Sequence, residues 1–151
     1  MGYKHILVAY DGSELAQKAL EQAVSLIRAN PVTQLTVLHA FHLPSIVVGA
    51  AYYAGSAIAD KEFYKYAEET LGKARKVVAE LPYTAVEMRE GFPIDTILET
   101  AEEKGCDLIV MGSRGLSGLK ELVLGSVSHA VVQKAKIPVL IVKGSGNGER
   151  E

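Results

Sequence analysis

Glycine and serine residues in the last third of the chain have the types and the spacing to bind phosphate. Gly112 and Gly115 follow the apolar run 107–111, and Gly125 and Ser126 come after nine further residues. The run has the length and β-branched content of a buried strand, and a helical pattern follows it. Glycine at such a turn permits positive φ and close approach of a ligand to the backbone. Because the N–H groups of a turn and of a helix N-terminus attract anions, the spacing predicts a cradle for nucleotide phosphates.

Three polar side chains would complete this cradle. Ser126 and Ser128 supply hydroxyls, and Arg114 supplies a positive charge if it points inward. Each residue also has a simpler interpretation. The glycines could only punctuate a loop, Arg114 could be a solvated loop arginine, and the serines could cap a helix. The spacing matches neither a P-loop nor the Gly-x-Gly-x-x-Gly pattern of dinucleotide-binding proteins.

Strands and helices alternate along the whole chain. Strands are expected at 5–10, 35–41, 83–90, 107–111 and 137–142, and helices at 14–27, 60–81, 94–101 and from near Ser117 onward. This alternation predicts an α/β fold, a single doubly wound domain with a five-stranded parallel sheet and helices on both faces. The nucleotide-binding domain is expected to cover 1–143, with a flexible tail at 144–151. Residues 43–58 have no clean period and are too apolar for plain disorder, which suggests a lid or an interface.

The turn after the first strand, Asp11-Gly12-Ser13, is the second candidate for ligand binding. In an open α/β sheet, ligands bind beyond the carboxyl ends of the strands where the strand order reverses. With the first strand central, that point lies between the first and fourth strands, and Gly112 to Gly115 follow the fourth. Both turns are therefore expected at one crevice. Asp11 could alternatively be only a helix N-cap, with Glu14 three residues later.

Composition excludes several other classes of protein. The 151 residues are 48% apolar and 23% charged, with a net charge of −2. Neither nucleic acid nor a membrane is therefore an expected partner, and no apolar run approaches the ~18–20 residues that span a bilayer. No signal peptide precedes the first strand, so a cytoplasmic location is expected. Cys106 is the single cysteine, expected to be a packed thiol, and the four histidines lack metal-site spacing. His39 is expected to be a packed histidine, and the tyrosines at 52, 53, 64 and 66 are expected to pack in the lid region or an interface.

The last strand, 137–142, is apolar and would lie at an edge of the sheet. A free row of N–H and C=O groups there is a pairing hazard, and Pro138 protects only its beginning. A two-fold homodimer that pairs this strand with its copy would cover it.

Five segments together resemble the ATP-binding branch of the universal stress protein family. They are 6–13, 38–40, 106–115, 125–128 and 138–142. The resemblance covers nearly the whole chain and implies the strand order 3-2-1-4-5 and, commonly, a homodimer. It also implies that Asp11 lies near the nucleotide and that the backbone around Ala40 faces the adenine, although His39-Ala40 departs from the more usual His-Val. Ribose and phosphates would be held by Met111, Gly112, Arg114, Gly115, Gly125, Ser126, Val127 and Ser128. The candidate set is completed by their neighbours Tyr10, Gly12, Ser13 and Ser113.

The function expected from these features is that of a regulator or sensor in the stress response that binds ATP, or ADP or AMP, with Mg²⁺. Asp11 would approach the metal only through the Mg–phosphate complex, and no metal site made by protein side chains is expected. No P-loop lysine or water-positioning residue is evident, so ATP hydrolysis is expected to be slow or absent. Two alternatives remain open: an ATPase or adenylate-using enzyme with Asp11 as metal ligand, and an interaction module that uses no nucleotide. The protein partner is unknown.

Overall fold

The computed structural model describes residues 2–43, 45–48, 51–54, 57–114 and 124–144. Its strands are β1 (His5–Ala9), β2 (Gln34–Phe41), β3 (Ser45–Val48), β4 (Ala51–Ala54), β5 (Thr84–Glu90), β6 (Leu108–Gly112) and β7 (Val139–Val142). Its helices are α1 (Glu14–Ala29), α2 (Ala57–Val78), α3 (Pro93–Glu103) and α4 (Ser126–Lys134). The predicted tail beyond residue 144 lies outside the described residues.

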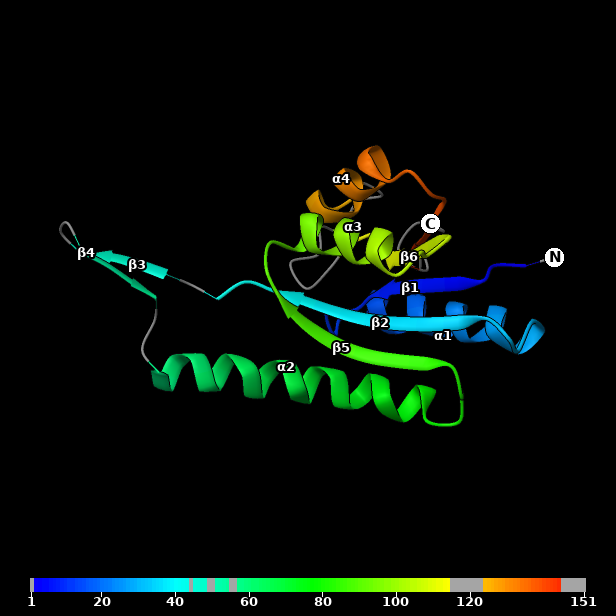
Figure 1. Cartoon of the computed structure of the whole chain (residues 1–151), viewed down its shortest axis with the longest axis horizontal. Coiled ribbons are helices and arrows are strands. Elements are labelled where there is room, and N and C mark those ends of the chain that lie inside the picture. Colours follow the sequence, from blue (N-terminus) through cyan, green and yellow to red (C-terminus); the bar gives the residue numbers. More distant parts are fainter. Residues whose placement is uncertain (1, 44, 49–50, 55–56, 115–123, 145–151) are drawn as a thin grey trace, which may run out of the picture.

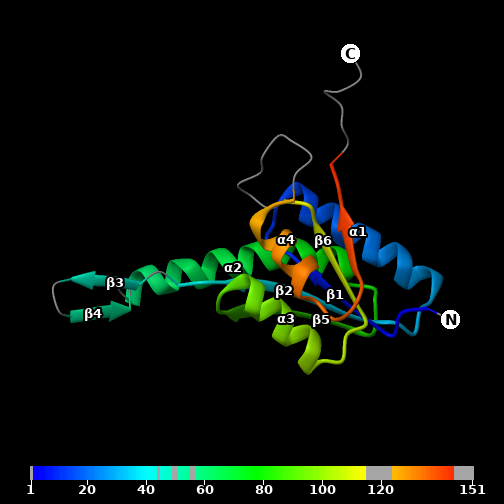
Figure 2. The ribbon, with the colours of Figure 1, turned by 90° about the horizontal axis from the view of Figure 1, so that it is seen from above.

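Five of the strands form one parallel sheet in the order β5-β2-β1-β6-β7. Numbered along the predicted five strands, this is the order 3-2-1-4-5, so the predicted fold is confirmed. The sheet lies between two layers of helices, with α3 and α4 on one side and α1 and α2 on the other (Figures 1 and 2). Strand β1 is central, and its Ile6, Leu7 and Val8 are completely buried.

Each face of the sheet has its own apolar core. Ile6 and Val8 of β1 point toward α1 and α2, where Leu20 and Leu71 pack against them. Leu7, between them in sequence, points to the opposite face and packs in a second cluster with Ile97 of α3 and Val131 of α4. Successive strand residues face opposite sides of a sheet, so a strand covered on both sides is apolar throughout. This explains the nearly continuous apolar runs of β1 and β6.

Residues 45–48 and 51–54 form two strands that the sequence did not predict. Strands β3 and β4 pair antiparallel as a separate hairpin, with Ile46 opposite Tyr53 and Val47 opposite Tyr52. The hairpin is inserted between β2 and α2 and stands clear of the five-stranded sheet in both ribbon views (Figures 1 and 2). The segment predicted as a lid or an interface therefore contains regular structure that does not lie over the sheet.

The helix predicted from near Ser117 begins later than expected. Gly125 is extended, with φ −63° and ψ 166°, and α4 starts at Ser126. A single helix therefore does not run through residue 125, and the part of the prediction on 117–123 lies outside the described residues. The predicted end of α3 is confirmed, because Gly105 follows the C-cap with φ +65°.

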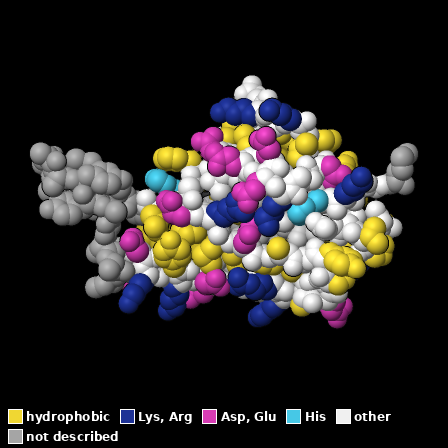
Figure 3. Space-filling model, viewed as in Figure 1, with side chains coloured by type: hydrophobic (Ala, Val, Ile, Leu, Met, Phe, Trp, Pro, Cys, Tyr) yellow, Lys and Arg dark blue, Asp and Glu magenta, His cyan; other side chains and the backbone are white. Residues whose placement is uncertain are grey.

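The outer edge of β5 carries ion pairs that link it to the end of α3. Arg89 contacts Glu103 at 2.9 Å, and Glu87 lies 3.3 Å from Lys104 and 3.4 Å from Arg89. Charges on an edge strand discourage pairing with other chains. Positive and negative side chains are interspersed over this face of the molecule (Figure 3). Within the described residues, no helix is both long and apolar enough to cross a bilayer.

Candidate functional site

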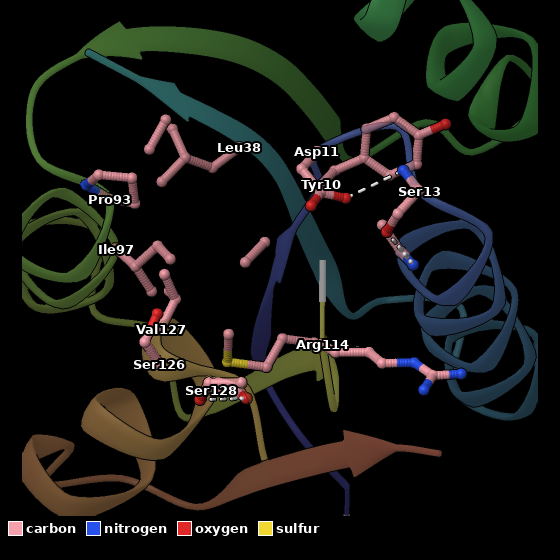
Figure 4. A pocket seen from close by; sticks show the side chains of 16 residues that line it. Tyr10, Asp11, Ser13, Leu38, Pro93, Ile97, Arg114, Ser126, Val127 and Ser128 are labelled. Carbon is pink, nitrogen blue, oxygen red and sulfur yellow. Dashed lines mark hydrogen bonds between the residues drawn. The ribbon is translucent and has the colours of Figure 1, made fainter. Parts of the chain in front are cut away.

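A cavity of about 630 Å³ opens at the carboxyl end of the sheet between the ends of β1 and β6. This is the crevice predicted from the reversal of strand order. Its lining combines strand ends, the β1–α1 turn and the starts of α3 and α4 (Figure 4). The lining residues are Ala9, Tyr10, Asp11, Ser13, Ala16, Leu38, Ala40, Pro93, Ile97, Met111, Gly112, Arg114, Gly125, Ser126, Val127 and Ser128.

The β1–α1 turn places the carboxylate of Asp11 at the pocket. Gly12 has φ +84°, which an L side chain rarely adopts, and the turn is closed by the Ser13 N–H donating to Asp11 Oδ1 at 2.9 Å. The helix N-cap is Ser13, because its Oγ accepts from the Ala16 N–H at 3.1 Å. The alternative in which Asp11 caps α1 is therefore wrong. Asp11 instead orients the turn through one oxygen and borders the cavity.

The two halves of the glycine motif are joined through one carbonyl group. The oxygen of Ser113 accepts from the Gly125 N–H at 2.7 Å and from the Ser128 hydroxyl at 2.7 Å. Ser113 is itself fixed by its N–H, which donates to Val142 of β7 at 2.9 Å. The start of α4 is thereby held beside the end of β6. Ser128 is 2% exposed and its hydroxyl donates to carbonyl groups, so it does not cap the helix, and its role as a phosphate ligand stays a prediction.

The first turn of α4 presents backbone N–H groups toward the cavity. Its N-cap is Gly125, and no side chain among the described residues caps the helix. The first intrahelical bond runs from His129 N–H to Gly125 C=O, so the N–H groups of Ser126, Val127 and Ser128 precede the bonded ladder. Their partial positive charge adds to the helix dipole. Ser126 is exposed and Val127 lines the pocket, so this turn is accessible from the cavity.

Two glycines of the motif lie where neighbouring elements pack closely, and Gly112 leaves no room for a side chain. A Cβ at Gly112 would lie 2.7 Å from Leu15 Cβ on α1, a distance that real side chains do not tolerate. A Cβ at Gly125 would lie 3.3 Å from Arg114 Cα and 3.4 Å from Ser113 O. The glycines therefore do more than punctuate a loop, because they bring α1, β6 and α4 into contact. Gly115 lies outside the described residues.

One wall of the cavity is apolar and ends in a strand edge that β1 does not pair with. Leu38, Pro93 and Ile97 form this wall, and Ile97 lies beside Val127 of α4 (Figure 4). The Leu38 carbonyl accepts from Tyr10 N–H at 2.8 Å, so the polar groups of Leu38 face β1. Alternate residues of a strand direct their backbone groups to the same side, so the N–H and C=O groups of Ala40 also face the side of β1. The pairing of β1 with β2 ends at Ala9 and Leu38. The N–H and C=O groups of Ala40 therefore point into the crevice.

Tyr10 and His39 stabilise the strand ends at this wall. His39 is buried, and its Nδ1 lies 2.9 Å from the Tyr10 carbonyl oxygen, so this nitrogen is the donor. The Tyr10 hydroxyl donates to Gln17 at 3.0 Å. Burial, with the nearby charge of Asp11, raises the pKa of Tyr10, so the phenol stays neutral. The prediction that His39 is a packed histidine is confirmed.

Arg114 borders the cavity but does not direct its guanidinium toward the start of α4. In Figure 4 its side chain extends toward α1, away from Ser126 and Ser128. Its Nη2 would lie 3.6 Å from a Cβ at Gly144, just beyond β7. The inward orientation considered from the sequence is therefore not the one found here.

All but three of the candidate residues line this cavity. Gly12 and Ser113 shape it through the turn and the junction described above, and Gly115 is not described. Sequence reasoning missed five lining residues: Ala9, Ala16, Leu38, Pro93 and Ile97. Pro93 had a detectable signal, because it follows the third predicted strand and strand ends of a parallel sheet share one edge. Among the described residues, no cluster of His, Cys, Asp or Glu side chains is arranged to hold a metal ion.

Several known proteins share this fold along almost all of the present chain. The model of the universal stress protein family matches residues 2–143. Universal stress protein YxiE of Bacillus subtilis is 41% identical over 153 residues, which covers 93% of this chain and 99% of YxiE. The solved structure of MJ0577, a universal stress protein of Methanocaldococcus jannaschii, superposes with a TM-score of 0.76 at 28% identity and covers 96% of this chain and 99% of that chain.

Two further solved structures contain nucleotides. One is a universal stress protein in complex with cAMP, with a TM-score of 0.67, 26% identity and coverage of 96% of this chain and 100% of that chain. The other is the universal stress protein from Archaeoglobus fulgidus in complex with dAMP, with a TM-score of 0.65, 26% identity and coverage of 95% and 100%. Together with the fold and the glycine motif, these matches show that the chain belongs to the universal stress protein family.

Proposed function

We propose that this protein binds ATP, or ADP or AMP, in the cavity between β1 and β6 and acts as a nucleotide-dependent regulator or sensor in the stress response. The observation that carries the proposal is the first turn of α4, which has a glycine N-cap and no capping side chain among the described residues. A helix start of this kind attracts phosphate through its N–H groups and its dipole. The junction at Ser113 holds it beside the end of β6.

The apolar wall supports an adenine base at the other end of the cavity. Leu38, Pro93 and Ile97 supply apolar surface, and Ala40 directs one backbone donor and one acceptor into the crevice. Adenine offers an acceptor ring nitrogen beside a donor amino group, which complements such a pair, whereas guanine offers the reverse order at the corresponding edge. The nucleotides in the two related complexes, cAMP and dAMP, both carry adenine.

Asp11 supports a role for Mg²⁺ at the phosphates. Mg²⁺ is commonly held by one or two carboxylates together with phosphate oxygens and water. Asp11 Oδ1 is used by the turn, and its second oxygen is the one suited to such a complex. The described residues that line the cavity include no lysine and no histidine to activate a water molecule, so we expect hydrolysis of ATP to be slow or absent.

Regulation would be exerted through another protein or through a second copy of the chain. Strand β7 is an edge of the sheet, and its Leu140 is 39% exposed, which favours a homodimer that pairs 137–142 across a two-fold axis. We place the protein in the cytoplasm, with no nucleic acid or membrane as partner. The identity of the protein partner does not follow from the sequence or the fold.

Calorimetric titration with ATP, ADP and AMP, with and without Mg²⁺, tests the proposal. We expect micromolar or tighter binding of ATP, weakened at least tenfold (about 1.4 kcal/mol) by Gly125→Val, because a side chain there meets the backbone of Ser113 and Arg114. Gly72→Val is the matched control, since nothing lies within 4 Å of a Cβ at that helix position. If no nucleotide binds, the glycine motif serves packing only, and the alternative of an interaction module that uses no nucleotide is favoured. Phosphate release over many turnovers would favour the ATPase.

A further inference from the structure

The turn that carries Asp11 is supported from behind by α2, a helix outside the cavity. Thr70 of α2 is buried, with 6% of its surface exposed. A Cβ at Gly12 would lie 3.0 Å from the Thr70 methyl carbon Cγ2 and 3.8 Å from its hydroxyl oxygen. The methyl group therefore packs against the backbone of Gly12. The neighbouring buried residues Ala67, Leu71 and Ala74 are apolar, so Thr70 is the one polar residue among the buried residues described for α2.

The position of the turn determines where the Asp11 carboxylate lies. The backbone at Gly12, with φ +84°, lies directly between Asp11 and Ser13. The bond from Ser13 N–H to Asp11 Oδ1 makes the carboxylate part of the turn. A movement of Gly12 toward α2 would carry the carboxylate with it, because the bond ties the two together. Glycine has no side chain of its own to resist such a movement, so the resistance comes from the surface behind it.

From this geometry we infer that Thr70 is a positioning residue, which holds the Asp11 carboxylate toward the Mg–phosphate end of the bound nucleotide by packing its methyl group behind Gly12. This inference rests on the proposed nucleotide function. Thr70 does not line the cavity and touches no ligand, so its effect is transmitted through the turn.

A double-mutant cycle with Asp11 separates this role from a general effect on folding. Thr70→Ala removes the packing methyl, and we expect it to weaken Mg-ATP binding roughly fivefold. Thr70→Val keeps a methyl group behind Gly12 and should bind as the wild type does. Asp11→Asn keeps the acceptor for Ser13 but loses the charge, so Thr70→Ala should have no additional effect in that background. Thr100→Ala, a buried threonine of α3 outside the cavity, is the matched control and should leave affinity unchanged.

Each outcome has a distinct meaning. If the wild type binds no nucleotide, the proposed function itself fails. If it binds and Asp11→Asn weakens binding, but Thr70→Ala does not, only the role of Thr70 is overturned. An equal loss from Thr70→Ala in the wild-type and Asp11→Asn backgrounds would also overturn it, since the effect would then bypass the carboxylate. Should Thr70→Ala fail to fold, Thr70→Ser, which also lacks the methyl, replaces it in the same cycle.

Discussion

The two ends of the five-stranded sheet treat similar polar groups in opposite ways. At the amino end, Asp107 accepts hydrogen bonds from the N–H groups of Lys4 at 2.9 Å and His5 at 3.0 Å. The ring of His5 uses both nitrogens, with Nδ1 3.1 Å from the Lys104 carbonyl and Nε2 2.8 Å from the Thr36 hydroxyl. At the carboxyl end, Asp11 borders a cavity and α4 begins without a capping side chain among the described residues.

The starts of α1 and α4 repeat this contrast within the site itself. Helix α1 has Ser13 as a capping side chain and Glu14 in its first turn, so its N–H groups and dipole are met by its own chain. Helix α4 has Gly125 as its N-cap and no acidic residue in its first turn, and its Ser128 hydroxyl donates to carbonyls instead. Where the chain's own side chains bond the free N–H groups of a helix start, they stabilise the fold. Where no side chain does so, these N–H groups are available to bind an anion such as phosphate.

The largest expected effect comes from disrupting the contact between the start of α1 and the end of β6. In Gly112→Ala the new Cβ would meet Leu15 Cβ at 2.7 Å, which forces α1 and β6 apart. Overpacking of this kind costs about 1–3 kcal/mol, so we expect a loss of stability of this size in chemical denaturation. Because both elements line the cavity, we expect ATP affinity to fall by roughly 10- to 100-fold as well when α1 and β6 move apart. Unchanged stability and affinity would contradict the close approach of the two elements.

A smaller effect should follow from making the start of α4 resemble that of α1. Ser126 is exposed and holds the position in α4 that Glu14 holds in α1, so Ser126→Glu places a carboxylate in the first turn. We expect stability to rise by about 0.5 kcal/mol, because the charge complements the helix dipole. ATP affinity should fall about tenfold, with a weaker effect on adenosine, because the carboxylate repels phosphate. Calorimetry with both ligands measures the difference, and an equal loss for ATP and adenosine would contradict this account. Glu14→Gln provides the reciprocal control.

The smallest effect concerns the amino end of the sheet, where the contributions of His5 and Asp107 to stability depend on pH. Burial lowers the pKa of His5 from its ordinary 6.5, partly offset by the bond to the Lys104 carbonyl. Below pH 6.5 the unfolded chain therefore binds more protons than the folded one, so stability is full above 6.5 and declines as pH falls through the lowered pKa. Burial acts to raise the pKa of Asp107, but the N–H donors of His5 and Lys4 outweigh it and lower that pKa from 3.8. Its contribution is therefore lost in a second step, as pH falls from 3.8 through the lowered value.

Denaturant unfolding as a function of pH measures both steps. His5→Asn should remove the step that begins at pH 6.5 and leave the step below 3.8 in place. A stability that increases as pH falls from 6.5 to 4 would contradict a neutral, partly buried His5.

The fold was predictable because its strands carry a strong local signal. The runs of β1 and β6 are apolar throughout, since helices cover both faces of the sheet, and this pattern with the helices between them predicts a parallel sheet. Strands β3 and β4 were missed because each has only four residues, at the lower limit of length at which a strand pattern can be recognised.

Periodicity also misplaced the start of α4. Leu119, Leu122, Val123 and Val127 have helical spacing, but the spacing continues across Gly125, where the backbone is extended. The glycine is fixed by its bond to Ser113, a contact between distant parts of the chain that a local pattern does not contain. The orientation of Arg114 and the wall formed by Pro93 and Ile97 depend on tertiary packing in the same way.

The carbonyl of Ser113 has a consequence for how this protein tolerates change. Because it accepts from both Gly125 and Ser128, it holds the first turn of α4 at two points. A substitution that removes one of these two bonds, such as Ser128→Ala, therefore leaves the other to keep the phosphate-facing helix start beside the end of β6.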